Sequence, residues 1–112
     1  DSWSTDLKGV SRVNAIINCF TRMRFLDQRG ICNFIEKKKP KNNDDLLIPW
    51  FMNEEMKIKD MNIFFGHWST LGDFRFKNVF CLDAGCVWGG EMIGIDIEEP
   101  SRKIKFHSSI SR

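Results

Sequence analysis

A histidine and an aspartate stand at the ends of two apolar runs, where the chain is best placed to do chemistry. His67 follows a run that ends in Gly66, and Asp83 follows a second run and precedes a glycine-rich loop, residues 85–90. Such short apolar runs must be buried, and the glycines let the backbone turn sharply after them. Because ligands tend to lie outside strand ends in sheets covered by helices, His67 and Asp83 are the first candidates for a site.

Two arginines form a second candidate group. Arg22 and Arg24 alternate with apolar residues, so both guanidinium groups face the same side if the segment is a strand. That arrangement suits bidentate contacts to a polyphosphate, and a pair of solvated arginines on an open strand face also fits the pattern. Asn18 is near enough in the sequence to share the site, or else it lies at the cap or polar side of a helix end.

The four cysteines offer a different chemistry. Cys19, Cys32, Cys81 and Cys86 are irregularly spaced in a chain without secretory features, which predicts free thiols rather than a disulfide framework. Cys81 and Cys86 have a spacing within the reach of paired zinc ligands, with His67 as a third. No second pair accompanies them, so structural zinc is the least favoured interpretation.

A helix and a hairpin are expected to position the arginines. Val10, Val13, Ile17 and Phe20 recur at intervals of three or four residues, which predicts a short helix capped by Ser11 and ending near Phe20. The pattern then changes to a period of two. The expected strand, turn and returning strand of an antiparallel hairpin are residues 22–25, 27–30 and 31–35.

The remaining sequence predicts mostly strands. Pro49 indicates an extended entry to Trp50 and Phe51, which are expected to cover the core, and residues 53–60 favour a second short helix. The segments expected to be extended are 61–65 and 79–82 as buried strands, 71–78 as a loop or short ribbon, and 93–97 with 104–106 as an antiparallel hairpin. We therefore expect a β-rich α+β architecture with one or two helices.

Composition narrows the class of protein. A chain of 112 residues holds one domain at most, and no apolar run approaches the roughly 18 residues that a membrane span needs. The net charge of +2 is too small to indicate nucleic-acid binding, and the basic run at residues 37–41 reads as a solvated loop with the polar residues 42–45. The expected compartment is the cytoplasm, with neither a membrane nor a nucleic acid as partner.

Three sequence blocks carry a resemblance to a known family. They are Asn18 with Thr21-Arg22-Met23-Arg24-Phe25, then Phe65-Gly66-His67-Trp68, then Leu82-Asp83-Ala84-Gly85-Cys86-Val87-Trp88-Gly89-Gly90. In this order and spacing the chain resembles the C-terminal part of the symmetrical bis(5'-nucleosyl)-tetraphosphatases, diadenosine tetraphosphatases of the calcineurin-like metallophosphoesterase superfamily. The resemblance runs from Trp3 to about Phe106.

The resemblance implies hydrolysis of diadenosine tetraphosphate to two ADP at a dinuclear centre of divalent ions, manganese, cobalt or similar. Such ions lower the pKa of a bound water and neutralise charge on the phosphate oxygens. His67 maps onto a metal ligand of the family, against the alternative of a solvent-exposed loop histidine. The implied fold, over residues 1–112, is the incomplete C-terminal portion of one four-layer sandwich domain, with two sheets flanked by helices.

The resemblance also gives the other residues their roles. Arg22, Arg24 and Asn18 are implied to contact the substrate. Asp83 either orients His67 or holds the glycine loop through backbone N–H groups. Trp68 and Trp88 either stack on an adenine or pack in the core, and Trp88 is taken as the substrate-binding one.

The departures from the family are as informative as the matches. Ala84 stands where the family usually has threonine, which puts the fine geometry of the loop in doubt. The superfamily's Asp-x-His, Gly-Asp-x-x-Asp and Gly-Asn-His blocks do not occur in this chain, which begins at Asp1. We therefore expect a fragment whose N-terminal partner completes the site, and which alone is inactive and binds no metal stably. The alternatives are a non-catalytic remnant or split product that serves as a binding module, and a small zinc or nucleic-acid module.

Overall fold

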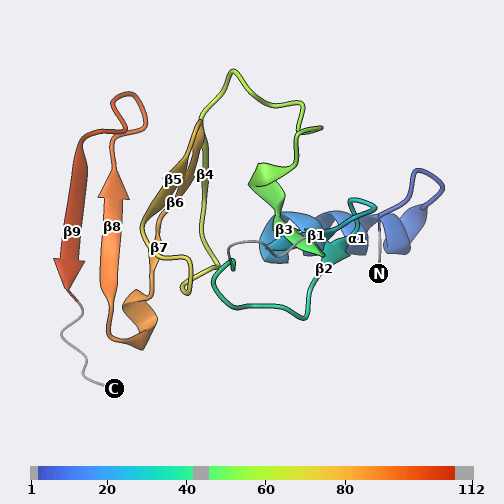
Figure 1. The fold of residues 1–112 in the computed structure, drawn as a ribbon, viewed down its shortest axis with the longest axis horizontal. Helices are drawn as coiled ribbons and strands as arrows, with labels where there is room; N and C mark the ends of the chain where they lie inside the picture. The colour runs from blue at the N-terminus through green and yellow to red at the C-terminus, as the bar shows by residue number, and fades with distance from the viewer. Residues whose placement is uncertain (1–2, 42–45, 108–112) are drawn as a thin grey trace. The chain divides into compact units, whose positions relative to one another are not determined.

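The computed structural model describes residues 3–41 and 46–107 of the chain (Figure 1). The chain divides into two compact units, Asp1–Lys57 and Ile58–Arg112. Among the described residues, the first unit holds a helix and one small sheet, and the second holds two small sheets. The β-rich α+β class expected from the sequence is confirmed, while the full sandwich stays a prediction.

The first unit consists of one helix and a three-stranded antiparallel sheet. Its elements are α1 (Gly9–Arg22), β1 (Phe25–Asp27), β2 (Cys32–Asn33), β3 (Leu47–Pro49) and a short 3-10 turn, η1 (Trp50–Met52). The strand order is β2-β1-β3, so β1 is the central strand. The predicted hairpin is confirmed with shorter strands, and its turn is closed by the Gly30 N–H, which donates to the Asp27 carbonyl at 2.9 Å. The expected loop at residues 37–41 has no helix or strand, and residues 42–45 lie outside the described part of the chain.

Helix α1 is longer than predicted at both ends. It begins at Gly9, with Lys8 as its N-cap and without a side-chain cap, so the prediction of a Ser11 cap is wrong. It continues past Phe20 because the Met23 N–H still donates to the Cys19 carbonyl, at 3.1 Å. Gly9 has a φ of 56°, a left-handed conformation through which glycine enters the helix at low steric cost.

The apolar stripe of α1 is present but lies on the surface. Val10, Val13, Ile17 and Phe20 are all exposed, Phe20 at 86%, and the buried residue of the helix is Ala15. Isolated exposed apolar residues are common, whereas a row of four on one helix face marks a surface that can be covered.

The predicted second helix at residues 53–60 is wrong. The Asn53 side-chain oxygen accepts from the Glu55 N–H at 3.0 Å, and the Met56 N–H donates to the Asn53 carbonyl at 3.1 Å. These bonds close a turn, and an asparagine that bonds its neighbouring backbone in this way competes with helix formation. The preceding step behaves as expected, because Phe51 is buried and its ring meets that of Trp50 edge-on, with centroids 5.5 Å apart.

The second unit contains two three-stranded sheets. The first has the order β4-β6-β5, built from β4 (Ile63–Phe65), β5 (Phe74–Phe76) and β6 (Val79–Cys81). The second has the order β7-β8-β9, built from β7 (Asp83–Ala84), β8 (Glu91–Ile95) and β9 (Lys103–His107), with the 3-10 turn η2 (Cys86–Trp88) between β7 and β8. The predicted hairpin near the C-terminus is confirmed as the antiparallel pair β8–β9, which lie side by side in Figure 1.

The core of the second unit is centred on β6. This middle strand buries all three of its residues, as its continuous apolar sequence predicts. Trp68 and Leu71 are also buried, and the rings of Phe64 and Phe80 stack with centroids 5.0 Å apart. Strand β4 is partly exposed along its whole length, so the prediction that both its faces are buried is wrong. Within the described residues, no helix combines the length and apolar character needed to cross a membrane.

Candidate functional site

Two strand ends in the second unit form the frame of the candidate site. Strands β4 and β6 pair in parallel, with Phe65 opposite Cys81, so their carboxyl ends lie at the same edge of the sheet. The Leu82 N–H extends this pairing by donating to the Phe65 carbonyl at 2.9 Å. His67 follows one strand end and Asp83 the other. The expectation that both residues stand at strand ends is thus met, and in open α/β sheets ligands commonly bind outside the carboxyl ends of the strands.

His67 has an unusual backbone conformation. Its φ is 60°, in the left-handed region that costs a residue with a side chain roughly 1–2 kcal/mol, although histidine is among the types found there more often. The side chain is exposed, whereas the next residue, Trp68, is 1% exposed. Trp68 anchors the chain immediately after the turn, and a conformation held against strain in this way is a recognised feature of functional positions.

Asp83 holds the glycine loop. Its Oδ1 accepts from the Gly85 N–H at 3.1 Å, which is one of the two roles expected from the sequence. The Gly85 carbonyl then accepts from both the Trp88 and the Gly90 N–H groups, each at 2.9 Å. These bonds tie both sides of η2 to a single backbone position and so fix the loop.

The loop also depends on close backbone contact at Gly90. A β-carbon placed there would lie 2.2 Å from the Ala84 carbonyl oxygen and 2.9 Å from the Gly85 carbonyl oxygen. No side chain fits without movement of the backbone. Ala84 itself lies in β7 opposite Glu91, so the position that departs from the family pattern is part of a strand pair.

The two tryptophans of this region differ in their exposure to solvent. Trp68 is a core residue whose carbonyl accepts from the Leu71 N–H at 3.0 Å, so the packing interpretation holds for it. Trp88 is 71% exposed on the loop, where its ring is accessible to a ligand. The two loops approach each other, because a β-carbon at Gly85 would lie 3.7 Å from that of Ser69.

The arginines in the first unit are not arranged as predicted. Arg22 is the last residue of α1 and β1 begins at Phe25, so Arg22 and Arg24 do not share a strand. Instead the Arg22 Nη1 donates to the Asn18 Oδ1 one helical turn earlier, at 3.3 Å. The prediction of a strand fails because the helical hydrogen bonds run through Met23, which overrides the local alternation of the sequence.

The structure therefore joins Arg22 with Asn18. The Arg22 guanidinium also lies over the Phe34 ring, 5.2 Å from its centroid, and its charge is favourably placed at the C-terminal end of the helix. Arg24 is partly buried beyond the helix end, and its carbonyl accepts from the Trp50 N–H at 3.0 Å.

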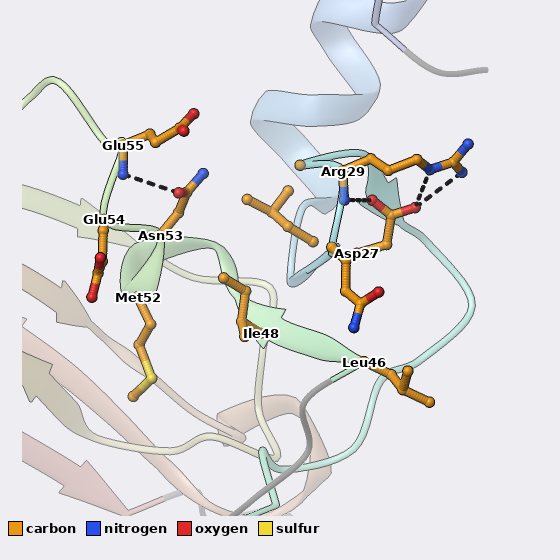
Figure 2. Close-up of a pocket in the computed structure, with 11 residues that line it drawn as sticks. Asp27, Arg29, Leu46, Ile48, Met52, Asn53, Glu54 and Glu55 are labelled. Atoms are coloured by element: carbon orange, nitrogen blue, oxygen red, sulfur yellow. Dashed lines mark hydrogen bonds and ion pairs between the residues drawn. The ribbon is translucent and has the colours of Figure 1, made fainter.

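The first unit also has a pocket that sequence reasoning missed (Figure 2). It has a volume of about 600 Å³ and lies between the hairpin turn, residues 27–30, and the segment 46–55. Leu26, Ile48 and Met52 supply its apolar surface. The predicted turn at residues 27–30 gave no hint of it, because the opposite wall comes from a segment about twenty residues later in the chain.

The pocket does not suit a polyphosphate. Its charged lining residues are Asp27, Glu54 and Glu55 against Arg29, so carboxylates outnumber the guanidinium. The Asp27 carboxylate accepts a hydrogen bond from the Ile31 N–H, which is the largest cause of its lowered pKa. Hydrogen bonds from the backbone and side chain of Arg29 lower the pKa further. None of the six candidate residues from the sequence lines this pocket.

Metal-ligand chemistry is sparse in the described chain. Over residues 3–41 and 46–107, no three histidine, cysteine, aspartate or glutamate side chains gather closely enough to hold a metal ion. His67, Cys81 and Cys86 therefore do not form the zinc site considered from the sequence.

The protein thus has a β-rich α+β fold, and its candidate site lies at the carboxyl ends of two parallel strands. No family model matches the chain. It is 43% identical over 98 residues to the symmetrical bis(5'-nucleosyl)-tetraphosphatase of Methylococcus capsulatus, 41% over 101 residues to that of Pseudomonas fluorescens, and 43% over 93 residues to that of Aeromonas hydrophila. These alignments cover 88%, 89% and 82% of this chain.

The resemblance found in the sequence is thus confirmed: the chain is a homologue of the C-terminal part of the symmetrical bis(5'-nucleosyl)-tetraphosphatases. It spans about a third of the length of these curated relatives, 35%, 35% and 34% respectively.

Proposed function

We propose that this chain is the C-terminal part of a symmetrical bis(5'-nucleosyl)-tetraphosphatase, a cytoplasmic hydrolase that converts diadenosine tetraphosphate to two ADP. The observation that carries the proposal is the identity of 43% over 98 residues to a protein of that name. The four free cysteines fit a reducing compartment. In this proposal residues 1–112 belong to one metallophosphoesterase domain of the calcineurin-like type.

His67 is proposed as the metal ligand that this part of the domain supplies. Its exposed position after β4 and its strained backbone support the assignment. In the complete enzyme His67 would hold one of two divalent ions, manganese or cobalt among the candidates, and such ions would supply an activated water and neutralise charge on the phosphates. The remaining ligands come from the upstream sequence, so the chain alone is expected to be inactive.

Substrate contacts are proposed for both units. Arg22 and Asn18 offer a paired guanidinium and amide suited to phosphate oxygens, with Arg24 as a further cation. Trp88 offers an exposed ring for an adenine, on a loop that Asp83 holds in place. In the first unit, we propose that the exposed stripe of α1 packs against the upstream part of the domain, because four apolar residues on one helix face suit a protein surface.

A chimera tests the proposed function. This chain replaces the C-terminal third of the Methylococcus capsulatus relative, and the products of diadenosine tetraphosphate are separated by chromatography in the presence of manganese. We expect ADP as the sole nucleotide product. A folded chimera without turnover would count against the proposed function.

The two histidines of the chain provide a matched pair for the role of His67. His67→Ala in the chimera should reduce turnover by about 100-fold or more, as loss of a catalytic metal ligand does. His107→Ala, in β9, should leave turnover unchanged. An active chimera that tolerates His67→Ala would retain the proposed reaction and refute the role of His67.

A further inference from the structure

Two cysteine sulfurs in the first unit are in contact. The Sγ atoms of Cys19, in the last turns of α1, and Cys32, in β2, are 3.7 Å apart. Both residues are partly buried rather than enclosed in the core. The two cysteines are thirteen residues apart in sequence, and their contact joins two elements of the same unit.

We infer that Cys19 and Cys32 form an oxidisable dithiol, a modification site at which hydrogen peroxide or an organic hydroperoxide produces an intramolecular disulfide between α1 and β2. A disulfide requires a sulfur separation of about 2.05 Å, so the two atoms must approach by roughly 1.6 Å. The inference is independent of the proposed hydrolase activity.

The reaction proceeds in two balanced steps. The Cys19 thiolate attacks one peroxide oxygen, the O–O bond breaks, and Cys19 becomes a sulfenic acid while the other oxygen leaves as hydroxide and takes up a proton to give water. Cys32 then attacks the Cys19 sulfur and loses its proton, the S–O bond breaks, and a second water leaves. Two thiols are thereby oxidised by two electrons, and one hydrogen peroxide is reduced to two waters; an organic hydroperoxide gives one alcohol and one water instead.

The environment of Cys32 suits it to the second step rather than the first. Burial, followed by the neighbouring Cys19 and the charge of Asp27, raises the pKa of the Cys32 thiol to about 12. Cys32 is therefore protonated at neutral pH and is a poor nucleophile until it meets a sulfenic acid beside it.

Peptide mapping of the full chain tests the inference. The reduced protein is treated with one to a few equivalents of hydrogen peroxide with a chelator present, and free thiols are then blocked and the protein digested with trypsin without reductant. Cleavage after arginine and lysine places Cys19 in peptide 13–22 and Cys32 in peptide 30–37. We expect these two peptides joined, with a mass about 2 Da below their sum, and separated again by dithiothreitol.

Two single variants make the test specific. Cys32→Ser should abolish the joined peptide and leave a Cys19 sulfenic acid that dimedone captures, while Cys86→Ser should form the 13–22/30–37 link as readily as the parent protein. Far-UV circular dichroism of each variant before oxidation establishes that it is folded. A parent protein in which Cys19 is trapped by dimedone without the link, or in which the links join other cysteines or separate molecules, overturns the inference.

Discussion

Replacement of Gly90 by alanine should be among the most damaging single-methyl changes in this chain. The new β-carbon would lie 2.2 Å from the Ala84 carbonyl oxygen. That distance is about 1 Å shorter than an ordinary contact between carbon and oxygen, and the atom it meets belongs to the backbone, so rotation of a side chain cannot relieve the clash. The loop between β7 and β8 has to open.

The loss of free energy of unfolding can be estimated from the packing and the hydrogen bond that are disturbed when the loop opens. Forcing extra volume into a packed position costs about 1–3 kcal/mol. Movement of Gly90 also strains its hydrogen bond to the Gly85 carbonyl, at 2.9 Å, and a lost bond of this kind costs about 1 kcal/mol. We therefore expect Gly90→Ala to reduce the free energy of unfolding by roughly 2–4 kcal/mol.

Gly94→Ala is the matched control. Gly94 lies in β8, only four residues away, and a β-carbon there meets nothing within 4 Å. Alanine in a strand interior is favoured over glycine by about 0.5–1 kcal/mol, so this variant should be as stable as the parent or slightly more stable. Urea denaturation followed by tryptophan fluorescence and circular dichroism measures both. If the two variants unfold within about 0.5 kcal/mol of each other, the close contact at Gly90 is not a constraint on the fold.

Two further predictions concern the backbone at His67 and the ion pairs of Asp73. His67 and Lys77 both have a positive φ, 60° and 54°, so glycine at either should keep the free energy of unfolding within about 1 kcal/mol of the parent. Only His67→Gly should abolish hydrolysis by the chimera. Equal loss of turnover in Lys77→Gly would contradict a specific role for the imidazole. Burial of Asp73 opposes ionisation, but its bonds to Lys103 and Lys105, at 2.6 and 3.0 Å, outweigh burial and lower its pKa below 3.8. The stability that these pairs add is complete well above pH 3.8 and is lost as the pH falls through the lowered pKa. Asp73→Asn should therefore cost about 1 kcal/mol in urea denaturation at pH 7 and less at pH 2. An equal cost at both pH values would contradict this.

Local patterns in the sequence predicted the elements that depend on local chemistry. The hairpin β8–β9 follows from strict alternation around a turn, and the burial of β6 from its continuous apolar sequence. Arg22 shows where this fails, because Arg22-Met23-Arg24-Phe25 alternates like a strand while the helical hydrogen bonds continue to Met23. The pairing of β1 with β3 is likewise not visible locally, since the partners are about twenty residues apart.

The candidate site was predictable to the same degree. His67 and Asp83 were placed at strand ends because the glycines after each apolar run are a local signal, and the parallel pairing of β4 and β6 brings those ends to one edge. The partnership of Arg22 with Asn18 was not predicted, because it depends on the exact end of α1. The acidic pocket beside the turn at residues 27–30 was not predicted, because its walls come from segments that are far apart in the sequence.

Because Cys81 is completely buried, its reaction with a thiol reagent can report the local opening of β6. Cys81 is 0% exposed in β6, the central strand of the β4-β6-β5 sheet, with its sulfur 4.0 Å from the Trp68 carbonyl oxygen, and burial raises the pKa of its thiol. A thiol reagent reaches Cys81 only when β6 opens, whereas the three partly buried cysteines are accessible without such opening. When opening is fast relative to labelling, the slow phase of the reaction is proportional to the open population and reports the free energy of local unfolding around β6.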